Sequence, residues 1–221
     1  MRFVNDVFRY EPDINMFKKA LFTIIILIVL LSAAFSQGKW ELKRNENGIE
    51  VFTRTPLTGN LKELRVICEL TTTKTQLIKT LQDIKHYNDW VYCTRKTTML
   101  KTVNSQQIIF YSVSHLPWPI KDRDLIVQLS LIPDSTTNRF EIQAKSLPDY
   151  LPKNPDLIRV PYSLALWKVI VVDDHTLKVD YTFSVNPGGN LPPWLVNTTL
   201  AIGPYNSFMG LRDELKKAAS K

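Results

Sequence analysis

Residues 176–197 read TLKVDYTFSVNPGGNLPPWLVN, and the spacing of their apolar side chains changes partway along. Over 177–185 every second residue is apolar, which predicts a strand with one buried and one solvated face. Residues 187–190, Pro-Gly-Gly-Asn, then predict a turn. The two prolines that follow are tolerated in the first turn of a helix. We therefore predict a helix over 192–217, with a kink at Gly203-Pro204.

The same alternation recurs earlier in the chain and predicts further strands. Between two of them, Thr73 and Gln76 form a possible capping box before apolar residues at helical spacing. This first helix is expected to end near residues 87–90. The order of elements predicts one α+β domain built on an antiparallel sheet. The other predicted strands are 49–53, 64–70, 96–103, 107–113, 125–131, 139–145 and 164–172.

The apolar face of such a sheet must be buried by other elements. Two helices are too few to fill the hollow of a strongly bent sheet of about seven strands. Such a fold tends to leave an internal void, and an apolar void is a site for an apolar ligand. The pattern therefore indicates a protein that binds a hydrophobic small molecule.

A basic pair, Lys18-Lys19, precedes the almost wholly apolar stretch ALFTIIILIVLLSAAF at 20–35. This stretch is short for a membrane-spanning helix, which needs about 20 residues. Together with the small residues around Ser36, it is typical of a secretory signal peptide whose removal leaves Gln37 first. An uncleaved membrane anchor over residues 20–35 is the alternative. Either predicts an exported chain, in the periplasm or another extracytoplasmic compartment.

Met16 stands directly before this pattern, which suggests that residues 1–15 come from a misassigned start codon. We expect residues 1–36 to be the signal peptide or anchor and residues 37–221 to form the folded domain. The formal charge is +7, but lysine and arginine are scattered along the chain. That pattern favours a solvated basic surface, or contact with an anionic membrane, over nucleic-acid binding.

The two cysteines, Cys68 and Cys93, both lie in the exported part. A disulfide is allowed in that compartment, but two thiols alone do not establish one. Cys68 falls on the apolar face of a predicted strand, which favours a buried free thiol.

Two motifs resemble a known family. Residues 116–125, LPWPIKDRDL, are similar to the "PWP…RD" signature of START domains, the steroidogenic acute regulatory protein-related lipid transfer family. Residues 186–197, NPGGNLPPWLVN, resemble the family's approach to its C-terminal helix. Trp40 with the segment 48–52, and Trp90 after the first helix, fall where the family places similar residues.

The resemblance spans about residues 38–218 and suggests a bacterial exported member of the family. It implies a helix-grip (START/Bet v 1-like) fold, a curved antiparallel sheet wrapped around a long C-terminal helix. An internal apolar cavity would hold one lipid or sterol-like ligand, for carriage or sensing. The gate loop would comprise Pro117, Trp118 and Pro119 and face that helix. The alternative role for Trp118 is a core plug that pins the loop.

Arg123 and Asp124 of the signature are expected to tie the loop to the following strand. Several lipid-transfer members also bury an acid in the strand before this loop and an arginine six residues after the signature arginine. Here those positions hold Ser112 or Val113 and Leu129. Because one unpaired buried charge would be costly, losing both together is self-consistent. We therefore expect a drier cavity.

The C-terminal helix carries an apolar stripe that would line the cavity or simply pack in the core. If the stripe lines the cavity, a ligand with a long acyl chain needs no polar group to bind, because each buried methylene contributes roughly 0.8 kcal/mol. The stripe consists of Leu195, Thr199, Ile202, Phe208 and Met209.

The sequence contains three histidines, His86, His115 and His175. No GxSxG elbow, metal-spaced His/Cys cluster or Gly-rich phosphate loop accompanies them. We therefore predict that the protein is not an enzyme and needs no metal or cofactor. Two alternatives remain. One is a cavity-fold cyclase or hydrolase that uses His115 as acid or base, and the other is a membrane-anchored protein-interaction module.

Overall fold

A computed structural model describes residues 38–54, 62–116, 118, 120–133, 138–191 and 193–220, without the side chains of residues 62, 133 and 193–201. The chain divides into two units, residues 1–39 and 40–221. The predicted signal peptide or anchor, residues 1–36, lies outside the described residues. Among the helices that the structure does describe, none has the length and apolar character required to cross a membrane.

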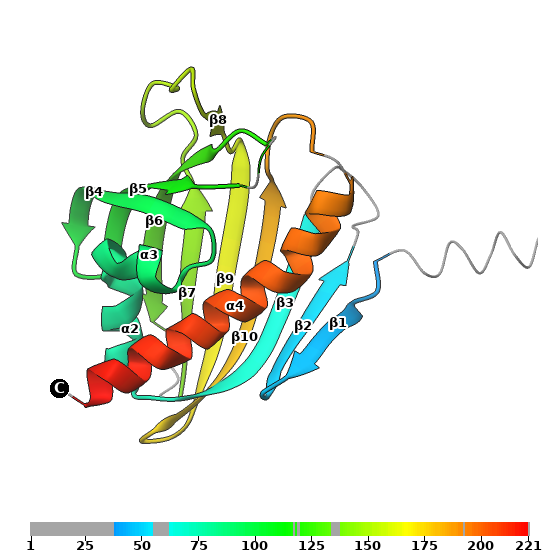
Figure 1. Cartoon of the computed structure of the whole chain (residues 1–221). Helices are drawn as coiled ribbons and strands as arrows, with labels where there is room; N and C mark the ends of the chain where they lie inside the picture. Colours follow the sequence, from blue (N-terminus) through cyan, green and yellow to red (C-terminus); the bar gives the residue numbers. More distant parts are fainter. Residues whose placement is uncertain are drawn as a thin grey trace, which may run out of the picture. The chain divides into compact units, whose positions relative to one another are not determined.

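The second unit is built on one curved sheet, in which the described residues form ten strands (Figure 1). Their order is β1-β2-β3-β10-β9-β7-β6-β5-β4, and neighbours along this path are antiparallel. The short β8 pairs in parallel with β6. The strands are β1 (Glu41–Glu46), β2 (Ile49–Arg54), β3 (Lys62–Thr71), β4 (Thr94–Asn104), β5 (Gln107–Ser114), β6 (Arg123–Pro133), β7 (Arg139–Ser146), β8 (Ile158–Arg159), β9 (Tyr162–Asp173) and β10 (Thr176–Asn186).

The helices are α2 (Lys74–Gln82), the 3-10 turn η1 (Ile84–His86), α3 (Tyr87–Trp90) and α4 (Pro193–Ala219). Thr73 caps α2 as predicted, because its hydroxyl accepts from the Gln76 backbone N–H at 3.1 Å. The prediction of one continuous first helix was wrong. Asp83 has φ −81° and ψ 68°, a conformation outside the helical region, and this residue separates α2 from η1.

The predicted strand over 177–185 is β10, and its alternation sets the two faces of the sheet. Leu177 and Val179 are completely buried on the concave face, which is the face of the sheet that α4 crosses (Figure 1). On the outer face Asp180 accepts two hydrogen bonds from Arg65 of β3, at 2.7 and 2.6 Å. The sequence pattern thus assigns the buried face of this strand correctly.

The C-terminal half of α4 packs firmly on the sheet. Phe208 lies against the rings of Trp167 and Tyr181, with centroid distances of 5.2 and 5.4 Å. Leu211 and Leu215 are 0% and 2% exposed. Burying a side chain of this size contributes roughly 1.5–3 kcal/mol. This half of the helix closes its side of the fold with a filled core.

Polar contacts fix α4, from Tyr205 onward, to the β1–β2 hairpin and to β3. The Arg212 guanidinium donates to the backbone carbonyls of Asn47, Gly48 and Glu69. The Asn47 side-chain amide donates to the Tyr205 hydroxyl at 2.6 Å. The helix is therefore attached to one edge of the sheet by side chains that reach backbone groups as well as by apolar packing.

Candidate functional site

Along β10 the concave face is fully buried at one end, here called the sealed end, and only half-buried at the other, here called the accessible end. Along β10, Leu177 and Val179 are fully buried, whereas Tyr181, Phe183 and Val185 on the same face are only half-buried. The change occurs along the strand toward the turn that leads into α4. Since alternate residues of a strand face the same side, this gradient shows that the concave face of β10 is less completely covered toward the turn that leads into α4.

Side-chain size changes in the same direction on the neighbouring strands. Phe140 of β7 is paired with Val169 of β9 at the sealed end, and Trp167 of β9 is paired with Tyr181, where the burial along β10 begins to fall. Toward the accessible end, Ala144 and Ala165 stand opposite each other in the β7–β9 register. Small side chains at paired positions leave volume that larger ones would fill. The sequence therefore places two of its smallest apolar side chains opposite each other on this part of the concave face.

Polar side chains follow the alanines at this end. Ser112, Ser146 and Ser163 are 8%, 5% and 3% exposed, and the Ser163 backbone N–H donates to the Ser146 hydroxyl at 2.8 Å. Arg123 at the start of β6 is 4% exposed and shares the concave face with Leu125 by alternation. We call these four residues (Ser112, Arg123, Ser146 and Ser163) the polar end of the concave face.

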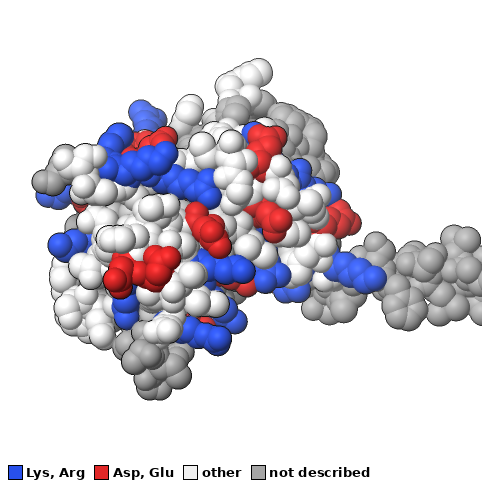
Figure 2. All heavy atoms as spheres, turned by 90° about the horizontal axis from the view of Figure 1, so that it is seen from below, with Lys and Arg blue, Asp and Glu red and all other residues white. Residues whose placement is uncertain are grey.

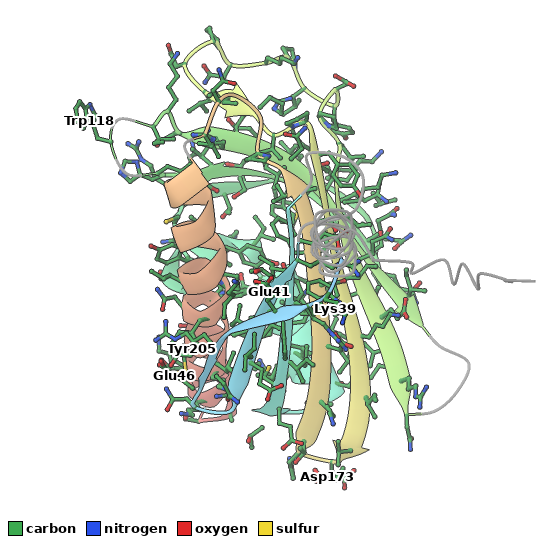
Figure 3. The ribbon with its side chains drawn as sticks, turned by 90° about the vertical axis from the view of Figure 1, so that its right-hand side faces the viewer. Lys39, Glu41, Glu46, Trp118, Asp173 and Tyr205 are labelled. Atoms are coloured by element: carbon green, nitrogen blue, oxygen red, sulfur yellow. The ribbon has the colours of Figure 1, made fainter. Side chains whose placement is uncertain are left out.

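The predicted gate loop lies at the end of the molecule where α4 begins. Its Trp118 projects away from the rest of the fold (Figure 3) and is 93% exposed. Trp118 therefore does not fill a core position, which rules out the core-plug alternative in this structure. Pro117 and Pro119 lie outside the described residues, and a gating role for the loop stays a prediction.

Asp122 holds the two ends of this loop together. Its carboxylate accepts from the Leu116 backbone N–H at 3.2 Å and lies 3.0 Å from the His115 ring. The Arg95 guanidinium is 3.5 Å away on the solvent side. His115 is thus part of a surface cluster, with 67% of its side chain exposed.

The neighbours Arg123 and Asp124 point to opposite faces of the sheet. Arg123 donates to the Lys121 carbonyl at the end of the loop, and the role of the motif in tying the loop to β6 stays a prediction. Asp124 instead binds Arg159 on the outer face, through contacts of 3.0 and 2.8 Å. Its second partner is the Tyr111 hydroxyl, which donates to it at 3.2 Å.

Arg159 joins the segment 147–160 to the outer face of the sheet. It also donates to the backbone carbonyls of Pro148, Leu151 and Pro152. A shallow pocket of about 310 Å³ surrounds the ion pair, lined by Thr98, Leu100, Tyr111, Asp124, Leu151, Pro152, Asn154 and Arg159. Sequence reasoning missed this pair, because nothing in the pattern links an aspartate in β6 to an arginine 35 residues later.

The two positions compared in the sequence analysis, 112 or 113 and 129, carry no charge in this chain. Leu129 is 6% exposed within the core, and Ser112 belongs to the polar end. The ion pair that is buried among the described residues, Asp124–Arg159, lies on the outer face. The one buried cation on the described concave face is Arg123.

The predicted stripe on α4 divides into three parts. Phe208 is buried between aromatic rings, and Met209 is half-buried against the core. Ile202 is 36% exposed. The side chains of Leu195 and Thr199 lie outside the described residues. A cavity-lining role for the stripe therefore stays a prediction.

The remaining chemical groups are dispersed. No cluster of three His, Cys, Asp or Glu side chains suited to a metal occurs among the described residues. Cys68 and Cys93 are both free, and Cys68 is buried as predicted. His86 contacts Asp83 at 2.8 Å at the end where α4 finishes. That end of the molecule shows intermingled charges of both signs (Figure 2).

Comparison with known proteins places this geometry in a fold class. No family model matches the chain. The uncharacterized protein PA1579 of Pseudomonas aeruginosa is 26% identical over 202 residues, covering 88% of this chain and 98% of its own length. The structural matches described next confirm the helix-grip α+β fold that the sequence predicted. The chain has the fold of START domains.

The solved structures similar to this chain include START domains from bacteria and humans. The STAR-related lipid transfer protein of Xanthomonas axonopodis has a TM-score of 0.72 and 25% identity, over 80% of this chain and 98% of that one. Human STARD10 has a TM-score of 0.70 and 20% identity, over 96% and 82% of the two chains. The Zhui aromatase/cyclase from Streptomyces matches more weakly, with a TM-score of 0.51 and 10% identity over 73% and 94%.

Proposed function

We propose that this protein binds a lipid or another hydrophobic small molecule between the concave face of its sheet and the first half of α4. It would act as a carrier or sensor and not as an enzyme. The observation that carries the proposal is the accessibility gradient along β10, from fully buried Leu177 to half-buried Phe183 and Val185. The lipid transfer proteins among its structural neighbours support the same reading.

Energetics favour an apolar occupant in such a space. The residues around it are Leu125, Ala144, Ala165, Phe183 and Val185, and all of them are buried or half-buried. Each methylene removed from water contributes roughly 0.8 kcal/mol, so a long acyl chain gains enough to bind by burial alone. The aromatic stack around Phe208 would set the closed end of the space.

Ligand exchange would take place at the end where α4 begins. From Tyr205 onward, α4 is held by Tyr205 and Arg212, and in this proposal the residues of α4 before Tyr205 move with the gate loop away from the sheet. Exposed Trp118 suits a membrane interface, because an indole ring has a large apolar body and one polar N–H. The apolar N-terminal segment supports action in an extracytoplasmic compartment.

A catalytic alternative rests on His115, since an aromatase/cyclase shares the fold. His115 is 67% exposed and held by Asp122 on the loop surface, away from the concave face. Acid–base chemistry on a buried substrate requires the group within hydrogen-bonding reach of it. This placement supports binding over catalysis.

Native mass spectrometry of the chain, purified without detergent, tests the proposed function. We expect a fraction of the protein to carry one additional mass in the range of a lipid, and the ligand-free fraction to take up the methyl ester of cis-parinaric acid. A chain that carries no extra mass and takes up neither this ester nor the free acid would refute the proposal. It would instead favour a protein-interaction role.

A further inference from the structure

Arg123 is a buried cation in an apolar setting. Arg123 is 4% exposed. Its position in β6 places it on the same face as Leu125 and Val127, which adjoin the core. Asp124, the next residue, is on the opposite face and is bound to Arg159. The Arg123 guanidinium therefore belongs to the concave side, where the proposed ligand space lies.

Its hydrogen bonding is incomplete. Among the described residues the acceptor of Arg123 is the Lys121 carbonyl, and its Nε is buried without a partner. No described carboxylate lies within 4.0 Å of it. Burial lowers the pKa of Arg123 below its ordinary value, and nearby Asp122 only partly opposes the shift.

The carboxylates on either side of Arg123 in the sequence both bind other side chains. Asp122 binds His115 and Arg95 at the loop surface, and Asp124 binds Arg159 on the outer face. A contrast is Arg44, whose Nε is also buried without a partner. Its charge is balanced by Glu46 at 2.8 Å. Burying a charge without such a partner is costly, so a structural role alone does not account for Arg123.

Gly189 lies near the Arg123 guanidinium, beside Ile158. Gly189 has φ +62°, and a Cβ at that position would be 4.0 Å from Arg123 Nη2. The turn before α4 therefore passes close to the guanidinium without placing a side chain on it. The serines of the polar end (Ser112, Ser146 and Ser163) lie on the same face and supply further hydroxyl groups.

We propose that Arg123 binds the anionic oxygen group of an amphiphile whose apolar chain lies between the concave face and α4. This inference rests on the proposed function and adds the chemical class of the ligand. A guanidinium offers paired N–H donors that match a carboxylate or a phosphate, and burial strengthens such charge-assisted bonds. An anion on the ligand would supply the negative partner that Arg123 lacks among the described residues.

Fluorescence titration with cis-parinaric acid and its methyl ester at pH 8 tests this role, because the two probes differ in charge and share the chain. We expect the wild type to bind the acid more tightly than the ester. In Arg123→Met, affinity for the acid should fall about ten- to a hundredfold, as for loss of a hydrogen bond to a charged group. Affinity for the ester should be unchanged, and the melting temperature should not fall.

Arg95→Met is the matched control, because it removes a guanidinium at the same end whose side chain is 70% exposed. It should leave both affinities unchanged. Displacement of the acid by lysophosphatidate, but not by monoacylglycerol, would assign phosphate as well as carboxylate recognition. If the wild type binds both probes equally, or Arg123→Met keeps the preference for the acid, the inference fails and the proposed function stands. If neither probe binds, both fail.

Discussion

Asp124 and Arg159 form a two-point ion pair across the outer face of the sheet, with Arg159 Nε and Nη2 3.0 and 2.8 Å from the two carboxylate oxygens. Their side chains are 1% and 4% exposed. Arg159 also donates to carbonyls of the segment 147–160, so the pair attaches that segment to β6. This contact stabilises β6, the strand that carries Arg123, from the face opposite the proposed ligand space.

Asp124→Asn should therefore destabilise the fold strongly. Removing one partner leaves Arg159 buried without its counter-charge, which typically costs about 3–5 kcal/mol. Urea denaturation followed by far-ultraviolet circular dichroism measures the loss. Arg65→Ala is the matched control, since the Arg65–Asp180 pair is bidentate but about one-third exposed. It should cost about 1 kcal/mol or less. Equal losses of unfolding free energy in the two variants would contradict the claim that the buried pair stabilises the fold more than the exposed pair.

Ala144→Phe should block ligand uptake while leaving the fold intact. Ala144 faces Ala165 on the accessible part of the concave face, so an added ring would occupy the proposed ligand space. Gln143→Phe adds a ring at the adjacent residue on the outer face and should leave uptake unchanged. Uptake of cis-parinaric methyl ester measures the difference. Undiminished uptake by a folded Ala144→Phe protein would place the ligand elsewhere.

The sequence predicts the fold well because strand alternation and the change of period after β10 are local signals. β1 was not predicted, because its residues, ELKRNE, show no apolar alternation and five of the six are exposed. β8 has only two residues and is defined by its pairing with β6. The break at Asp83 depends on how η1 and α3 pack, which helical spacing does not report.

The candidate site is less predictable, because it depends on which face each charged side chain occupies. The motif singles out Arg123 and Asp124 but assigns both to one structural role. Their separation follows from strand geometry, but the partner of Asp124 depends on the path of the segment 147–160. The isolation of Arg123 follows in turn, because both neighbouring acids are bound elsewhere.

Gly210→Ala should destabilise α4, although alanine normally favours a helix by about 1 kcal/mol over glycine. A Cβ at Gly210 would be 2.9 Å from the Trp90 carbonyl oxygen and 3.0 Å from its Cα. The backbone of α3 must move to admit it, which costs roughly 1–3 kcal/mol. Asn206→Ala at an exposed position of α4 should be nearly neutral. Chemical denaturation of both variants checks the prediction, and a stabilised Gly210→Ala protein would refute the close contact.

Cys68 should resist alkylation in the folded protein. Burial raises the pKa of its thiol to about 12, so almost no thiolate is present at pH 8. Cys93 is only half-buried and should react first with iodoacetamide, as peptide mapping would show. Because the unfolded Cys68 thiol ionises near pH 9 and the folded one near 12, unfolding becomes easier as pH rises between those values. Rapid labelling of Cys68 at pH 8 would contradict its burial.

Trp118→Ala should slow ligand exchange with membranes without changing stability or equilibrium affinity. The ring is 93% exposed, so removing it deletes no core contact and should alter the free energy of unfolding by less than about 0.5 kcal/mol. Its loss would weaken insertion of the gate loop at the membrane interface, where indole rings are favoured. Transfer of cis-parinaric acid from anionic vesicles, followed by stopped-flow fluorescence, should be several-fold slower. Tyr92→Ala removes a 40% exposed aromatic elsewhere on the surface and should transfer normally. If Trp118→Ala matches the wild-type rate, or if both variants slow equally, the loop has no specific role at the membrane.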